Sequence, residues 1–343
     1  MLSYIALHNI IAINLNDTYN YKFSKDKGAI SNMKSNVLLA GGSGYIGKYI
    51  SNALEKDENV YALSKYPHSK KKEDTRIIWL KRDIYNYEDV VTGMEGMDIA
   101  YFYLDPNKHS AKLTQATARD LNLIAADNFA RAAMKQGLDK IVYVKGSRFD
   151  NETIQRLESY GVTVETTETY IKRPHINVEL QVSKYDDVRT ALKMVLPRKW
   201  TLSHLVDYFM TWINDTRGTF MHTYKENDNY IVYSRKKSKP LLILKKVTNA
   251  EDFITFHLVG GSMIKPNLKK QGKLEFRHIK GTRLVVVHLY DYIPRLFWPI
   301  YYFVQAPLQG LIMRGFEIDC RIKHFNGRVQ SLSLIHISEP TRQ

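Results

Sequence analysis

"VLLAGGSGYIGKYI", residues 37–50, decides the fold. Val37–Ala40 is a short apolar run, and the glycines that follow it stand at the spacing G-x-x-G-x-x-G. From Tyr45 to Leu54 apolar residues recur on one face of a helix. In such a strand–turn–helix unit the glycines let backbone N–H groups approach a pyrophosphate, and the helix N-terminus attracts its charge. A glycine-rich turn without a ligand is the alternative. We expect dinucleotide contacts from Gly41, Gly44, Tyr45, Ile46 and Gly47.

The end of the next predicted strand, Asn59–Lys65 ("NVYALSK"), bears on the choice of cofactor. An acidic residue there would bind the ribose hydroxyls of NAD, whereas a basic residue accommodates the 2′-phosphate of NADP. The strand ends in Ser64 and Lys65, and the first acid after it is Glu73. We therefore expect NADP(H) to be preferred over NAD(H), although a solvated surface lysine would give the same pattern.

Strands and helices alternate through the rest of this region. Arg76–Ile84 predicts a third strand whose Asp83 would meet the adenine. Asp98–Pro106 and Lys140–Ser147 predict a fourth and a fifth strand, separated by a long helix over Leu113–Gln136. This alternation predicts an α/β fold with a parallel, doubly wound Rossmann sheet, which binds ligands at the carboxyl ends of its strands.

The pattern changes from about Val182. A helix is predicted from Leu202, and five strand-like runs with glycine turns follow between residues 229 and 294. Consecutive strands joined by short turns predict an α+β unit with an antiparallel sheet. We therefore expect a Rossmann domain over 33–175 and a second domain over 182–330. Residues 1–32 are interpreted as a non-native or disordered leader, and residues 331–343 as an artefactual tail.

Composition narrows the function classes. Lys and Arg exceed Asp and Glu by 15 charges in 343 residues, so the surface should attract anions such as phosphorylated cofactors or acidic lipids. No DNA- or RNA-binding motif accompanies this charge, and nucleic acid is not an expected partner. The single cysteine excludes an internal disulfide framework and fits a reducing compartment, most simply a bacterial cytoplasm.

The stretches "AGGSGYIG", "DIAYFYL" and "KIVYVKGS" resemble the atypical short-chain dehydrogenase/reductases of the NmrA-like and YbjT-like group. The resemblance covers Lys34 to about Tyr170. It implies that Ser147, just after the fifth strand, orients a substrate carbonyl. The usual Tyr-x-x-x-Lys pair does not occur downstream of Ser147, and Tyr21–Lys25 matches the pattern by chance ahead of the first strand. Tyr160 and Tyr170 are nearby candidates for a substitute acid, although a surface or packing role is favoured for both.

Residues 272–316 resemble the domain of unknown function that follows the Rossmann domain in YbjT-like proteins. The resemblance implies a START-like sheet that grips a long helix, often around an apolar cavity. Leu296–Met313 carries no charge, but two prolines and two glutamines favour a packed helix over a membrane span. Reversible contact with anionic lipid stays open for this segment. The histidines at 257, 278 and 288 are interpreted as ordinary strand residues, and Arg277 with Glu275 as an ion pair.

Two classes of function follow. The first is an NADP(H)-dependent oxidoreductase acting on a small or lipid-like carbonyl compound. The second is a non-catalytic protein that senses NADP(H) or binds lipid.

Overall fold

The structure is a computed structural model that describes residues 34–41, 45–67, 77–104, 110–145, 150–167, 186–215, 221–234, 239–265 and 270–337. These residues divide into two compact units. The first draws on Met1–Ser110 and Asn122–Leu180, and the second on Ala111–Leu121 and Gln181–Gln343.

The first unit contains a parallel sheet of six strands in the order β3-β2-β1-β4-β6-β7. This order is that of a Rossmann fold, so the predicted fold class is confirmed for this unit. The order of strand addition reverses at β1. The chain first adds β2 and β3 on one side of β1, and then β4, β6 and β7 on the other side. In the order of the chain, the strands and helices are β1 (Asn36–Leu39), α2 (Tyr45–Leu54), β2 (Asn59–Ser64), β3 (Ile78–Lys81), α3 (Tyr87–Met94), β4 (Ile99–Phe102), α4 (Ala118–Gln136), β6 (Lys140–Tyr143), α5 (Asn151–Glu158) and β7 (Thr163–Thr166).

Helices cover both faces of this sheet, as two adjacent residues of β4 show. Tyr101 packs into the cluster that holds Ile46 and Ile50 of α2. Phe102 points the other way and meets Phe129 of α4, with ring centroids 5.2 Å apart. Because both faces are buried, the strands are continuous apolar runs, which is why the sequence alone identified them.

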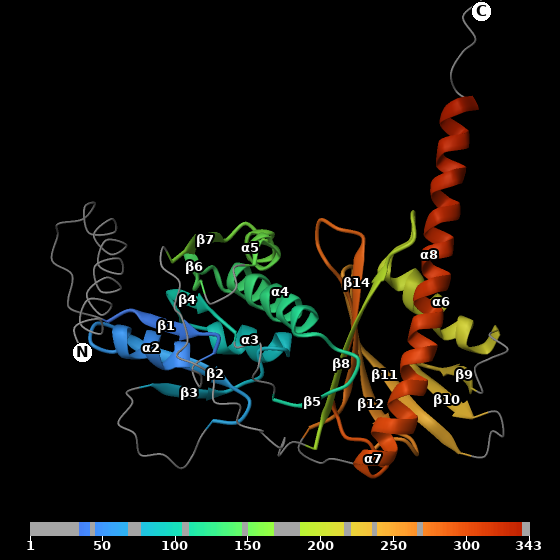
Figure 1. Cartoon of the computed structure of the whole chain (residues 1–343), viewed down its shortest axis with the longest axis horizontal. Helices are drawn as coiled ribbons and strands as arrows, with labels where there is room; N and C mark the ends of the chain where they lie inside the picture. The colour runs from blue at the N-terminus through green and yellow to red at the C-terminus, as the bar shows by residue number, and fades with distance from the viewer. Residues whose placement is uncertain are drawn as a thin grey trace, which may run out of the picture. The chain divides into compact units, whose positions relative to one another are not determined.

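The second unit is built on an eight-stranded sheet in the order β5-β8-β14-β13-β12-β11-β10-β9 (Figure 1). All neighbouring strands are antiparallel except β5 and β8. The strands and helices are β5 (Lys112–Leu113), β8 (Val188–Val195), α6 (Leu202–Asp215), β9 (Met221–Glu226), β10 (Asn229–Ser234), β11 (Pro240–Ala250), β12 (Phe253–Gly260), β13 (Lys273–His278), β14 (Leu284–Tyr292), α7 (Trp298–Ile300), the π-helix η1 (Tyr301–Gln305) and α8 (Ala306–Ile337).

Alternate strand residues of the second sheet pack against α6 and α8. Ile254, Phe256, Phe276 and Val287 share one core cluster with residues of both helices. Phe316 of α8 is fully buried there, and its ring centroid lies 4.8 Å from that of Phe209 and 5.3 Å from that of Trp212. The aromatic side chains of α6 therefore hold α8 against the sheet.

Two predicted elements differ from the structure. The helix expected over Leu113–Gln136 begins only at Ala118, because Lys112–Leu113 pair with β8 as a short parallel strand. The closing helical segment expected over Leu296–Phe316 continues to Ile337. Pro307 does not interrupt the helix, because the π-helical turn η1 precedes it directly and Ala306 N–H bonds to the Tyr301 carbonyl across that wider turn.

We predict that Phe316→Ala lowers the free energy of unfolding by about 3–5 kcal/mol, because the cavity left among Phe209 and Trp212 cannot be filled. Urea denaturation followed by circular dichroism measures it. The control is Thr211→Ala, at an exposed position of α6, which should change stability by less than about 0.5 kcal/mol. Equal effects of the two substitutions would contradict the packing of α8 described above.

Candidate functional site

The turn after β1 lies at the point where the first sheet reverses its strand order. Gly41 follows β1, and a Cβ on it would stand 2.8 Å from the backbone oxygen of Tyr103, just beyond β4. Any side chain at position 41 would therefore push apart the ends of two neighbouring strands. Glycine allows this close approach, and in open α/β sheets the crevice at this place receives the ligand.

The helix after the turn begins at Tyr45, and its first turn contains no acidic residue. Ile46 and Gly47 are buried, and Ile46 packs into the core of the unit. These two residues would help to bind an anion through their backbone N–H groups, which lie at the helix start, where the helix dipole is positive. Gly44 lies outside the described residues, as do Ser147 and Tyr170.

Lys65 and Asp83, which the sequence placed separately at the adenosine end, are joined in the structure. Lys65 Nζ lies 3.3 Å from Asp83 Oδ2, and both side chains are 2% exposed. Asp83 Oδ1 also accepts a hydrogen bond from the backbone N–H of Tyr85, and Asp83 donates its own N–H to Asp89. The positive charge of Lys65 is thus balanced within the protein.

The pairing of these two residues could have been inferred from the strand order. Ser64 and Lys81 are partners in the register of β2 and β3, so the residues that follow these strands are brought together. Ser64 is half-buried at the same edge, and its carbonyl accepts a hydrogen bond from Arg82 N–H. Ser64, Lys65 and Asp83 therefore occupy one end of the sheet, as expected from the sequence.

Tyr160 belongs to a buried charged cluster. Its hydroxyl donates to Asp127 Oδ1 at 3.0 Å, and Arg156 and Arg131 each lie 3.4 Å from the same carboxylate. Asp127 is fully buried on α4. These contacts and its burial give Tyr160 a packing role, one of the two non-catalytic roles that the sequence left open.

The second unit contains a buried ion pair and three histidines on strands. Arg277 donates from Nε to Glu275 Oε1 at 2.7 Å, and the two side chains are 1% and 0% exposed, so the predicted ion pair is confirmed. His288 stacks on Tyr290 with ring centroids 4.5 Å apart, and His278 Nε2 lies 2.7 Å from the Thr282 carbonyl oxygen. Burial and the charge of Lys273 lower the pKa of His257. Within the described ranges, no group of three His, Cys, Asp or Glu side chains is placed to hold a metal ion.

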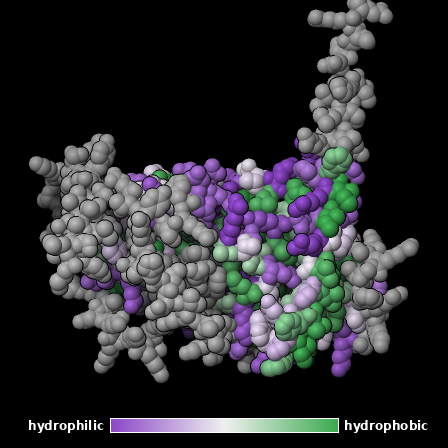
Figure 2. Space-filling model, viewed as in Figure 1, coloured by the Kyte–Doolittle hydropathy of each residue, from purple (hydrophilic) through white to green (hydrophobic). Residues whose placement is uncertain are grey.

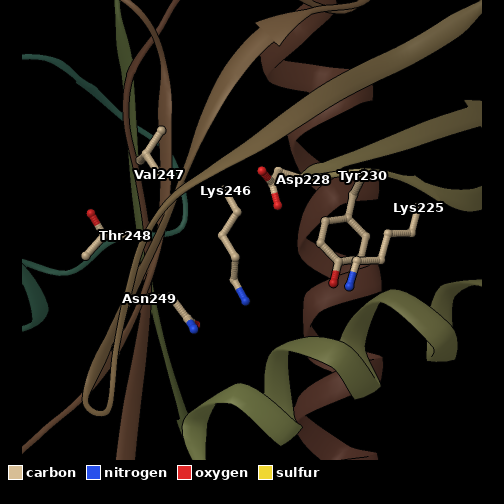
Figure 3. Close-up of a pocket in the computed structure, with 7 residues that line it drawn as sticks. All are labelled: Lys225, Asp228, Tyr230, Lys246, Val247, Thr248 and Asn249. Atoms are coloured by element: carbon tan, nitrogen blue, oxygen red, sulfur yellow. The ribbon is translucent and has the colours of Figure 1, made fainter.

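A surface pocket of about 350 Å³, which the sequence did not indicate, lies between β9, β10 and β11 (Figure 3). Lys225 Nζ stands 5.6 Å from the ring centre of Tyr230, whose hydroxyl donates to Asp207. Burial, reinforced by this hydrogen bond, raises the pKa of Tyr230 to about 12, so the hydroxyl stays protonated at neutral pH. The lining carries charges of both signs and consists of Lys225, Asp228, Tyr230, Lys246, Val247, Thr248 and Asn249.

In the part of the chain that the structure describes, none of the helices is both long and apolar enough to cross a bilayer.

Comparison with known proteins gives one extensive match. The chain is 54% identical over 299 residues to the auxiliary protein GraX of Staphylococcus aureus (strain NCTC 8325 / PS 47), covering 87% of this chain and 97% of that protein. No protein-family model matches the sequence.

Similarity to solved structures is partial. A nucleoside-diphosphate-sugar epimerase from Staphylococcus aureus is 16% identical with a TM-score of 0.31, over 52% of this chain and 56% of its own. The NADPH-dependent quinone oxidoreductase QOR2 of Escherichia coli, solved with NADPH, is 14% identical with a TM-score of 0.30, over 38% and 47%. The chain spans about half the length of these structures, and scores this low carry no argument about its function. Sequence identity over nearly the whole of both chains does decide the family: this chain belongs to the family of the auxiliary protein GraX.

Proposed function

We propose that the first unit binds a nicotinamide dinucleotide and that the chain serves as a cofactor-binding auxiliary protein. The observation that carries the proposal is the turn after β1, where Gly41 allows two strand ends to approach at the reversal of strand order. The pyrophosphate would lie against the turn of Gly41, Gly44 and Gly47, with backbone N–H groups of Tyr45 and Ile46 at the helix start.

The cofactor proposed is NADP(H) in preference to NAD(H). β2 ends at Ser64 without the acidic residue that would bind the ribose hydroxyls of NAD. Ser64 would donate to the 2′-phosphate, and Lys65 would share its charge between that phosphate and Asp83. Asp83 would fix the lysine at the edge of the adenine site.

The auxiliary role is supported by two observations. The relative at 54% identity is named an auxiliary protein, and the sequence lacks the Tyr-x-x-x-Lys pair downstream of Ser147. The lysine of that pair lowers the tyrosine pKa so that it can pass a proton, and without it hydride transfer has no assigned proton source. A protein that binds NADP(H) and responds to its redox state needs no such pair.

An NADP(H)-dependent oxidoreductase is the second candidate, favoured by Ser147 four residues after β6. This serine would orient a small or lipid-like carbonyl substrate beside the nicotinamide.

For the second unit we keep the START-like assignment as a proposal, supported by an antiparallel sheet that packs on a long helix. A cytoplasmic location with reversible membrane contact belongs to the same proposal.

We predict that the full chain binds NADPH at least tenfold more tightly than NADH. Gly41→Val should abolish both, because its side chain would meet the Tyr103 carbonyl oxygen. The measurement is a fluorescence titration, with circular dichroism to verify folding. Absence of binding to the unmodified chain would refute dinucleotide binding. Turnover of a carbonyl substrate that Ser147→Ala abolishes would instead favour the oxidoreductase.

A second prediction separates the structural role of Lys65 from its role in cofactor choice. Lys65→Met should lower the free energy of unfolding by about 3 kcal/mol, because it leaves the Asp83 carboxylate without its buried cation. Lys65→Met combined with Asp83→Asn, which removes the charge but keeps an acceptor for the Tyr85 N–H, should recover most of this stability in urea denaturation. The recovered double variant should still have lost the preference for NADPH.

Lys56→Met, at an exposed position, is the control and should change neither stability nor binding. If the double variant kept the wild-type preference for NADPH, Lys65 would have a structural role alone.

A further inference from the structure

The long helix α8 carries apolar side chains on the side that faces away from its own unit. Figure 2 shows hydrophobic residues gathered over α7 and the beginning of α8. Six of them on η1 and α8, which we call the outer stripe, are between 51% and 68% exposed: Val304, Leu308, Leu311, Ile318, Ile322 and Phe325.

The packing of α8 within the second unit does not involve the outer stripe. The side of α8 that faces the sheet holds Ala306, Phe316 and Cys320, which are 4%, 0% and 0% exposed. At 100° per residue, the outer stripe lies on the opposite side of the helix. A helix that is apolar on two opposite sides is typical of an element packed between two partners.

The spacing of the outer stripe indicates what the second partner is. From Val304 to Phe325 the intervals are four, three, seven, four and three residues, and Gly315 divides the interval of seven into four and three. This is the a/d spacing of a two-stranded coiled coil, with Leu308 and Ile322 at a positions. Gly315 falls at the a position between them, beside Trp212 of α6, and adds no side chain to the seam. The repeat runs over three heptads and about 33 Å of helix. The outer stripe therefore fits another helix.

The apolar surface extends beyond the outer stripe. Ile300 and Phe303, which precede α8 on α7 and η1, are 50% and 75% exposed. The outer stripe and these two residues together form the apolar surface that is open to a partner.

The charges beside the outer stripe complement each other between two copies of the chain. In the heptad numbering, the g positions hold Arg314 and Arg321, and the e positions hold Asp319 and Asn326. Asp319 Oδ2 accepts a hydrogen bond from the Tyr208 hydroxyl of its own chain, which leaves Oδ1 for a second partner. In a parallel pair the g side of one helix faces the e side of the other, so Arg314 of each copy would meet this oxygen of Asp319 on its partner. In an antiparallel pair the two arginine sides would face each other and repel.

The same charges disfavour a lipid surface as the occupant. Between Val304 and Asn326 the helix has three basic and two acidic residues, although the whole chain carries a net charge of +15. A helix that lies on anionic lipid is rich in Lys and Arg along its polar side. We propose that α8 forms a parallel, two-stranded coiled coil with α8 of a second copy of this chain, with the outer stripe as its seam.

Sedimentation equilibrium of the full chain should give a mass near twice 39.9 kDa that falls on dilution. Ile318→Glu and Ile322→Glu should each raise the dissociation constant of the dimer at least tenfold, with the circular dichroism spectrum unchanged. The matched control is Val259→Glu, at a residue of β12 that is 42% exposed, and it should leave the dimer intact.

A cysteine variant tests the direction of pairing. Ile322→Cys should form a disulfide between two copies under mild oxidation, because identical positions meet in a parallel pair. The native Cys320 should not compete, since it is buried and burial raises the pKa of its thiol to about 12. A chain that stays monomeric at all concentrations would overturn the proposal, as would a dimer that both glutamate variants leave unchanged. Binding of a monomer to vesicles of anionic lipid, lost in Ile318→Glu, would overturn it in favour of a membrane surface.

Discussion

Buried charge must be neutralised by a nearby partner, and in the first unit this constraint joins the ends of two neighbouring strands. Lys65 with Asp83, Arg156 with Asp127 and Arg277 with Glu275 are each nearly or fully buried. Removing one member of such a pair leaves an uncompensated charge, which costs far more than a surface salt bridge gains. The pair of Lys65 and Asp83 therefore holds the ends of β2 and β3 in fixed positions. The candidate adenosine site lies at this edge of the sheet, so the site depends on an interaction that has a structural role of its own.

The sequence predicted the first unit well because a doubly wound sheet buries both faces of its strands. Val37–Ala40 and Ile99–Phe102 are continuous apolar runs, and the glycines between β1 and α2 specify a turn that few other sequences adopt. The same local reasoning assigned Lys65 to solvent and to a phosphate. Its buried partner, Asp83, is near in space only because β2 and β3 are neighbours in the sheet. Periodicity within one strand holds no information on such a pair, whereas the strand order does.

In the second unit the alternation of apolar residues located β10 to β14, since one face of each strand packs on α6 and α8. β5, β8 and β9 were not predicted as strands. β8 carries Arg189 and Lys193 between apolar residues, and in isolation that segment also fits a helix. The predicted helix began at Leu113 because apolar spacing continues from there into α4, whereas Lys112–Leu113 form β5. Their pairing with β8, which is distant in sequence, decides the outcome. Residues of three strands line the pocket beside Tyr230, so no single stretch of the sequence indicated it.

The course of the chain relates the candidate cofactor site to the second unit. β4 ends beside the glycine turn, where Tyr103 O limits position 41 to glycine. After β4 the chain enters Ala111–Leu121, which belongs to the second unit, before α4 returns it to the first. Within that segment Lys112 lies over the Trp298 ring at 4.5 Å, and Asp120 forms an ion pair with Lys193 at 2.8 Å. The chain that leaves the end of β4 is therefore next held by side chains of the second unit, at Lys112 and at Asp120.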